Sequence, residues 1–150
     1  MLTENVRNSI KESVLCWLAT ADEDGCPNVS PKEMFMAFGE DKLIIANIAS
    51  PESIRNIKSN SKVCVSFVHV FKQKGFKISG QAKIIEGCDS RCSELKEELY
   101  SLGGREFEIK SVIEIVINKI SPIVAPSYWL FPETTESLLI EKAMITYQVS

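Results

Sequence analysis

Short apolar runs separated by tight turn signals make up most of this chain. Six of these runs have the length and the β-branched or aromatic content of strands. They are residues 14–20, 28–38, 43–47, 63–68, 76–85 and 112–117. Several connections are short and rich in turn residues, such as Asp22-Glu23-Asp24-Gly25, so strands that follow one another are expected to pair antiparallel.

Four other segments have helical patterns. In residues 3–12, Val6 and Ile10 stand four positions apart behind Thr3, which suits a helix cap. The other predicted helices are a short one from residue 51, then 90–102 and 135–147. The order of elements predicts a mainly β fold, a closed antiparallel barrel with peripheral helices, although an open α+β sheet would give the same pattern. Gly80 inside a strand predicts a bulge.

The composition bounds the classes of function. With 150 residues and 45% hydrophobic content, we expect one domain over 1–150, with a barrel core at about 13–118 and a tail and helix at about 119–150. A net charge of −3 without a basic stripe argues against nucleic acid. The N-terminus lacks a targeting pattern and no apolar run spans a membrane, so a cytoplasmic protein without membrane contact is expected.

The chain has five cysteines at irregular spacing and one histidine. An odd number of cysteines argues against a disulfide framework, so free thiols are predicted. Cys88 and Cys92 do not have a usual zinc spacing, and no metal site is expected. His69 alternates with Val68 and Val70, which indicates a sheet histidine with satisfied hydrogen bonds; a catalytic base is the alternative.

Residues 50–57 follow a buried strand and open a helix. Ser50 suits the N-cap and Pro51 the first helical position, while Ser53 and Arg55 place a hydroxyl and a guanidinium near amides without intrahelical partners. These donors and the helix dipole suit a phosphate. The alternative is that Ser50 only caps a surface helix.

Several short motifs, each weak by itself, follow one another along the chain. They are Leu18-Ala19-Thr20, Asp24-Gly25, Pro27-Asn28-Val29-Ser30-Pro31, residues 41–47, Ser50-Pro51, Ser53, Asn56-Ile57, Asn60, Val63, Gly80 and Ala82. In this order the chain resembles the pyridoxamine 5'-phosphate oxidase-like family of FMN-binding split-barrel flavoproteins, over residues 15–85. The resemblance implies a six-stranded antiparallel split β-barrel and a homodimer with FMN at the subunit interface.

The resemblance also implies which residues contact the flavin. They are Ser30, Pro31, Lys32, Ala46, Asn47 and Ser53. Charge and position add Arg55, and the predicted helix start adds Ser50. The family often has lysine where this chain has Glu52. We therefore expect Glu52 to point outward while Arg55 or Lys32 neutralises the phosphate. The alternative is a barrel whose FMN site has been lost.

Two further segments have open interpretations. Gln73 and Lys74 suit the O2 and N1 edge of the ring, or they form a solvated turn. Trp129 belongs to an aromatic run, for which we consider three places: over the flavin, against the partner subunit or in the core. We also expect Ile45 and Phe67 to hold the apolar edge of the ring at the barrel rim.

The expected function is that of a small FMN-dependent oxidoreductase or electron-transfer protein. No arginine follows Arg105, whereas true pyridoxamine 5'-phosphate oxidases hold their substrate with arginine in this region. A vitamin B6 oxidase is therefore the less favoured enzyme, and a non-catalytic module that binds flavin or haem for storage or sensing is the alternative of another class. The sequence identifies no catalytic acid or base.

Overall fold

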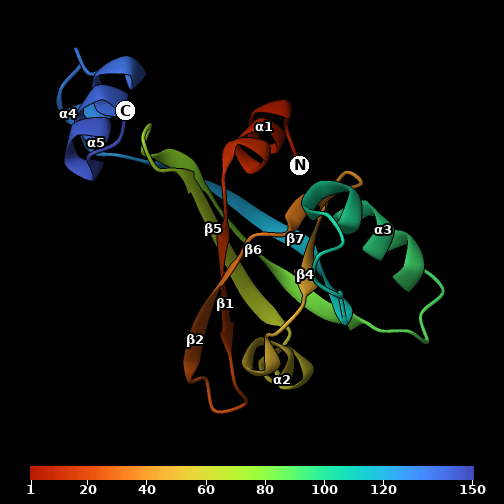
Figure 1. Ribbon diagram of the computed structural model, residues 1–150. Helices are drawn as coiled ribbons and strands as arrows, with labels where there is room; N and C mark the ends of the chain where they lie inside the picture. The colour runs from red at the N-terminus through yellow and green to blue at the C-terminus, as the bar shows by residue number, and fades with distance from the viewer.

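Seven antiparallel strands lie in the order β2-β1-β5-β6-β7-β4-β3 in the computed structural model, which describes residues 1–150. The strands are β1 Cys16–Ala21, β2 Pro27–Lys32, β3 Phe35–Phe38, β4 Lys42–Asn47, β5 Lys62–His69, β6 Lys74–Ile85 and β7 Ser111–Val124. The helices are α1 Glu4–Glu12, α2 Pro51–Ser59, α3 Cys92–Gly103, α4 Ser127–Leu130 and α5 Glu136–Tyr147. They lie outside the sheet (Figure 1). None of them combines the length and the apolar character that a membrane crossing requires.

The two edge strands of the sheet are joined by only two residues. Glu33 and Met34 connect β2 at one edge to β3 at the other, so the edges must lie close together and the sheet curls into a split barrel. The amide of Ala46 on β4 donates to the Met34 carbonyl at 2.9 Å and holds this crossing in place. The expectation of one continuous strand at 28–38 is therefore wrong, although the split-barrel class is confirmed.

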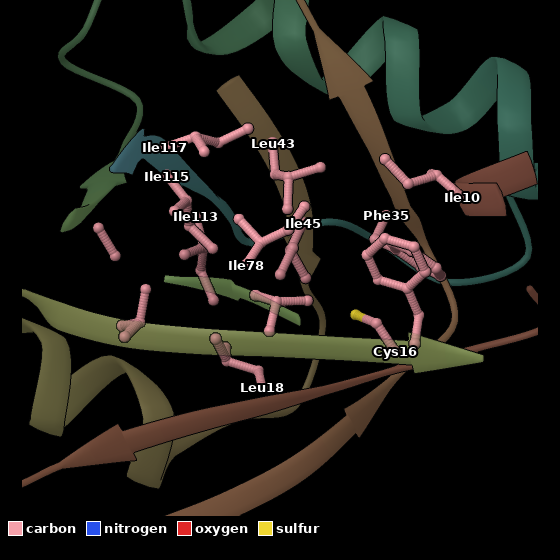
Figure 2. Packing of buried hydrophobic residues seen from close by; sticks show 14 of the residues in the cluster. Ile10, Cys16, Leu18, Phe35, Leu43, Ile45, Ile78, Ile113, Ile115 and Ile117 are labelled. Atoms are coloured by element: carbon pink, nitrogen blue, oxygen red, sulfur yellow. The ribbon is translucent and has the colours of Figure 1, made fainter. Parts of the chain in front are cut away.

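Apolar side chains of the strands fill the interior of the curled sheet. Figure 2 shows them converging from several strands. The labelled ones are Ile10, which comes from α1, and Cys16, Leu18, Phe35, Leu43, Ile45, Ile78, Ile113, Ile115 and Ile117 of the strands. Because side chains alternate between the two faces of a strand, the residues between them face outward. Ile45 and Phe67 belong to this core and are almost fully buried, so the expected place of both at the barrel rim is wrong.

The β6–β7 ladder bends at Gly80, where the register shifts as predicted. A Cβ there would collide with the Val116 carbonyl oxygen, so the close approach requires glycine. β7 continues to Val124, well past residue 117, where the sequence predicts the end of this strand. Past Ile117, β7 pairs only with β6, so Pro122 lies on an edge of the sheet. At such an edge a proline can lack the backbone N–H without breaking a hydrogen bond between strands.

Two of the helices begin at side-chain caps, and α3 covers part of the sheet. Thr3 accepts from the amide of Val6 at 3.4 Å, and Thr135 caps α5 in the same way, as the sequence indicates. α3 covers the outer face of β4 and β7 through a second apolar cluster. α4 and α5 lie apart from the barrel, at the end of the β6–β7 arm beside the turn between β5 and β6 (Figure 1). All five cysteines are free, as predicted.

Candidate functional site

A buried lysine without a carboxylate partner lies at the end of β2. Lys32 is 7% exposed, and its ammonium donates to the Ser50 hydroxyl at 2.6 Å and to the Ser30 hydroxyl. It takes part in none of the ion pairs of the chain. Burial lowers the pKa of Lys32, because desolvation disfavours its charged form.

The neighbour of Lys32 across the strands supplies no counter-charge. Cys16 pairs with Lys32 in the β1–β2 register, and burial raises the pKa of its thiol to about 12. The thiol therefore stays neutral at physiological pH. A buried cation with only hydroxyl partners is a suitable site for an external anion.

The start of α2 adds donors beside this lysine. Pro51 is the first helical residue, as the sequence predicts, and the amides of Glu52 and Ser53 have no intrahelical acceptor. Ser50 stands at the N-cap position, but its side chain makes no capping hydrogen bond. The cap predicted for Ser50 is therefore wrong, because its hydroxyl accepts from Lys32 and leaves the helix amides free.

Ser53 contributes an unpaired group to the same helix end. It is 1% exposed, and its Oγ has no hydrogen-bond partner in the protein. Buried hydroxyl groups without partners are rare because each one loses its bonds to water. This orphaned hydroxyl is compatible with a ligand oxygen reaching the first turn of α2.

Asn47 holds the helix start in position from behind. Its side-chain amide donates to the Ser111 hydroxyl at 2.8 Å, and its Oδ1 accepts from the backbone N–H of Ser50 at 3.3 Å. Both ends of the carboxamide are thus used inside the protein. The structure gives Asn47 this supporting role, and its direct contact with a flavin stays a prediction.

Glu52 and Arg55 form an exposed pair on the outer side of α2. The guanidinium of Arg55 lies 3.0 Å from the Glu52 carboxylate, and both side chains are more than half exposed. Glu52 thus points outward as expected. Of the two cations expected for a phosphate, Arg55 is thus paired with Glu52, whereas Lys32 has no carboxylate partner.

A cavity of about 790 Å³ opens beside Lys32 and Ser50. Four of the predicted site residues line it: Pro31, Lys32, Ala46 and Ser50. Its other walls come from α1, the β2–β3 crossing, the segment after β4 and the end of α3. They include Arg7, Lys11, Glu33, Met34, Ile48, Leu102, Glu106 and Phe107. The volume lies within the range of small-molecule sites, and most of these walls are apolar apart from a few charged groups.

The sequence does not reveal most of these additional lining residues. Glu33 and Met34 directly follow Lys32, so their position next to a predicted site residue could have indicated that they line the site. Arg7 and Phe107 come from segments far from the motifs, and only the packing of α1 and α3 brings them to the cavity. The remaining predicted residues, Ser30, Asn47, Ser53 and Arg55, do not line the cavity.

Gln73 and Trp129 lie elsewhere in the protomer. Gln73 is in the turn between β5 and β6, and Trp129 is an exposed residue of α4 beside that turn. Neither lines the large cavity. The predicted flavin contacts of these residues stay predictions, and they require a second copy of the chain.

The outer face of β1, β2 and β5 exposes large apolar side chains. They are Trp17 on β1 and Val29 on β2, with Val14 just before β1 and Val70 just after β5. A groove of about 400 Å³ crosses this face, with Trp17 and Val70 in its lining, and Val14 lines both this groove and the large cavity. The uncovered apolar face is therefore continuous with the candidate site. Exposed apolar patches of this kind mark interaction surfaces.

His69, the single histidine, lines this groove and not the large cavity. Its Nδ1 accepts from the backbone N–H of Lys72 at 3.2 Å, and its ring meets Phe71 edge-on. This agrees with the prediction of a sheet histidine with satisfied hydrogen bonds.

A family model described as pyridoxamine 5'-phosphate oxidase matches residues 2–123. The chain belongs to this family. The match extends from α1 to the end of the β7 arm and therefore includes the whole sheet and the cavity. The remaining C-terminal segment, with α4 and α5, lies beyond the matched residues of the pyridoxamine 5'-phosphate oxidase family.

Solved structures with this family fold resemble the chain at low sequence identity. HupZ of Group A Streptococcus has a TM-score of 0.71 at 21% identity, covering 83% of this chain and 96% of its own. An FMN-binding protein from Syntrophomonas wolfei has a TM-score of 0.69 at 19% identity, covering 81% and 85%. HutZ, the haem storage protein of Vibrio cholerae, has a TM-score of 0.66 at 15% identity, covering 82% and 94%. Among proteins with curated descriptions, none matches this chain.

Proposed function

We propose that this protein is an FMN-binding flavoprotein that acts as a small oxidoreductase or electron-transfer protein. The observation that carries the proposal is Lys32, a buried cation without a carboxylate partner beside a cavity of about 790 Å³. A phosphate would supply the missing counter-charge, and the free amides at the start of α2 add donors for its oxygens.

The walls of the cavity fit the rest of such a ligand. Pro31, Ala46, Met34 and Ile48 offer apolar surface next to the phosphate donors, and Phe107 adds an aromatic ring from the segment after α3. A flat, amphipathic ring requires apolar walls with backbone polar groups at their edges. We therefore assign the phosphate to Lys32, Ser50 and the α2 amides, and the ring to the apolar part of the cavity.

Bound FMN would supply the redox chemistry through its isoalloxazine ring. The residues of this chain bind and orient the ligand and keep water from one side of it. Lys32 neutralises charge at the phosphate end and has no acid–base role at the ring. We assign no catalytic acid or base.

The second part of the proposal is a homodimer with the flavin at the subunit interface. The apolar face around Trp17 and Val29 is uncovered in one protomer and continuous with the cavity through Val14. A second copy packed on this face would bury it and close the open side of the cavity. Gln73 and Trp129 then reach a flavin only from the partner copy.

A haem-binding storage or sensing module is the second candidate, because the fold is shared with HutZ. The side-chain chemistry of the large cavity favours flavin. Its lining contains Lys32 and Ser50, which adjoin the free amides at the start of α2, but no histidine, and the Nδ1 of His69 already accepts a backbone hydrogen bond. Oxidation of pyridoxamine 5'-phosphate is not favoured, because no arginine follows Arg105 to hold a second phosphate.

The test is to purify the native protein, record its visible spectrum and identify the released ligand by mass spectrometry. We expect a flavin spectrum bleached by dithionite, FMN as the released species, and negligible oxidation of pyridoxamine 5'-phosphate. A Soret band with released haem would contradict the flavin assignment. Rapid formation of pyridoxal 5'-phosphate would instead restore the vitamin B6 oxidase.

A further inference from the structure

The backbone of Gln73 has an unusual conformation for its residue type. Its φ is +54°, in the left-handed region that non-glycine residues seldom adopt. The only other non-glycine residue with positive φ is Gln148, which ends α5, a common place for this conformation. Gln73 instead ends the turn between β5 and β6, where hairpin loops use this conformation and surrounding contacts offset its cost for a non-glycine residue.

Hydrogen bonds from the C-terminal segment provide this restraint. The amide of Ala125 donates to the Gln73 carbonyl at 3.0 Å, and the Tyr128 hydroxyl donates to the Lys72 carbonyl at 2.7 Å. Within the turn, the amide of Gln73 donates to the His69 carbonyl at 2.8 Å. Both carbonyls of the peptide groups that flank Gln73 are therefore bonded to residues after β7.

Side chains restrain the same turn from both ends. The ammonium of Lys74 lies 4.2 Å from the ring centre of Tyr128 and 3.0 Å from the Glu136 carboxylate. Lys72 pairs with Glu12 at the end of α1, at 2.9 Å. Burial raises the pKa of the Tyr128 hydroxyl, so it remains a proton donor at neutral pH.

Ala125, Tyr128 and Glu136 all lie beyond residue 123, where the family match ends. Apart from the Lys72–Glu12 pair and the hydrogen bond to His69, the restraint on the turn thus comes from residues outside the matched segment. We propose that Tyr128 is a positioning residue, which fixes the backbone at Gln73 and thereby sets how the Gln73 carboxamide meets the flavin of the partner copy. This assignment rests on the proposed flavin function and dimer.

The substitution Tyr128→Phe tests the proposal, because it keeps the ring against Lys74 and removes only the hydroxyl donor. Tyr147→Phe is the matched control. Tyr147 also belongs to the C-terminal segment and keeps its edge contact with Phe71, while its hydroxyl makes no hydrogen bond within the protein.

The first measurement uses the protein without flavin and follows tryptic cleavage after Lys72 and Lys74. Loss of one hydrogen bond should raise the cleavage rate of Tyr128→Phe by roughly fivefold, and Tyr147→Phe should match the wild type. Adding Gln73→Gly, which adopts positive φ without strain, should reduce the effect of Tyr128→Phe. Equal cleavage rates for the wild type and Tyr128→Phe would overturn the proposal.

The second measurement uses the FMN-loaded protein and records the flavin absorption bands and the reduction potential. Tyr128→Phe should shift both, while Tyr147→Phe leaves both unchanged. Faster cleavage without any spectral or potential shift would overturn the positioning role and leave only a structural one. A wild type that binds no FMN would contradict the proposed function instead, and the cleavage measurement would still decide whether Tyr128 fixes the turn.

Discussion

The ammonium of Lys32 lies 2.6 Å from the hydroxyl of Ser50 and joins the end of β2 to the start of α2. This contact has two consequences. It occupies the hydroxyl that would otherwise cap the helix, so the first amides of α2 stay free. It also places a cation without a carboxylate partner beside those amides. Together they form the phosphate site that we propose.

Replacing Lys32 should therefore weaken FMN binding selectively. Charge-assisted hydrogen bonds contribute roughly 1.5 to 3 kcal/mol, so Lys32→Met should raise the Kd for FMN by about tenfold to a hundredfold. Riboflavin, which lacks the phosphate, should bind both proteins alike. Flavin fluorescence titration measures both constants, with Lys58→Met on the exposed side of α2 as the control for lost charge.

The charge on the outer side of α2 should modulate the same affinity weakly. Glu52 is exposed, so Glu52→Lys should leave the fold intact and strengthen FMN binding by a few-fold at low salt. Arg55→Glu should weaken it by less than Lys32→Met does, because Arg55 is exposed and paired with Glu52. Loss of FMN binding in Glu52→Lys would show that the carboxylate of Glu52 faces the ligand.

The stability of the flavin-free protein should depend on pH through Lys32. Burial lowers the pKa of Lys32 below its ordinary value of 10.5, so between the two values the unfolded chain holds one more proton than the native state. Native stability should therefore rise with pH in that window, as the buried charge is lost. Lys32→Met has no such charge and should be more stable than the wild type near neutral pH.

Urea unfolding of both flavin-free proteins from about pH 7 to about pH 10 checks this expectation. The stability advantage of Lys32→Met should shrink as the pH rises. An advantage that stays constant over the range would mean that Lys32 is not the titrating group.

A charge on the outer face of the sheet should separate the subunits. Trp17 is 46% exposed in one protomer, so Trp17→Arg should preserve the barrel but place a charge in the proposed interface. Light scattering should show a monomer. Flavin fluorescence titration should show an FMN affinity at least about tenfold lower than that of the wild type. Val116→Arg, at an exposed apolar residue of β7 that lines neither the cavity nor the groove, is the control and should stay dimeric.

Local chemistry made much of the fold predictable. Thr3 and Thr135 cap their helices, Pro51 begins α2, and Gly80 marks the bulge, because the residue type at each of these positions is itself a signal of the local structure. The break at Glu33 has no such local signal. It arises because the chain crosses from one edge of the sheet to the other.

The candidate site was predictable only in part, for the same reason. Lys32 and Ser50 stand in recognisable motifs, but their mutual hydrogen bond depends on how α2 packs against β2, so the sequence indicated a cap instead. Arg7 and Phe107 reach the cavity through the packing of α1 and α3. The pattern of one chain also does not place Gln73 or Trp129 relative to a second copy.

The most direct test of the phosphate site compares FMN with riboflavin on the wild-type protein after removal of bound flavin. Both ligands carry the same ring, so any difference in affinity comes from the phosphate and its partners at Lys32 and the start of α2. We predict that FMN binds at least about a hundredfold more tightly, from two or more charge-assisted hydrogen bonds. Equal affinity for the two flavins would contradict the assignment of Lys32 and α2 as the phosphate site.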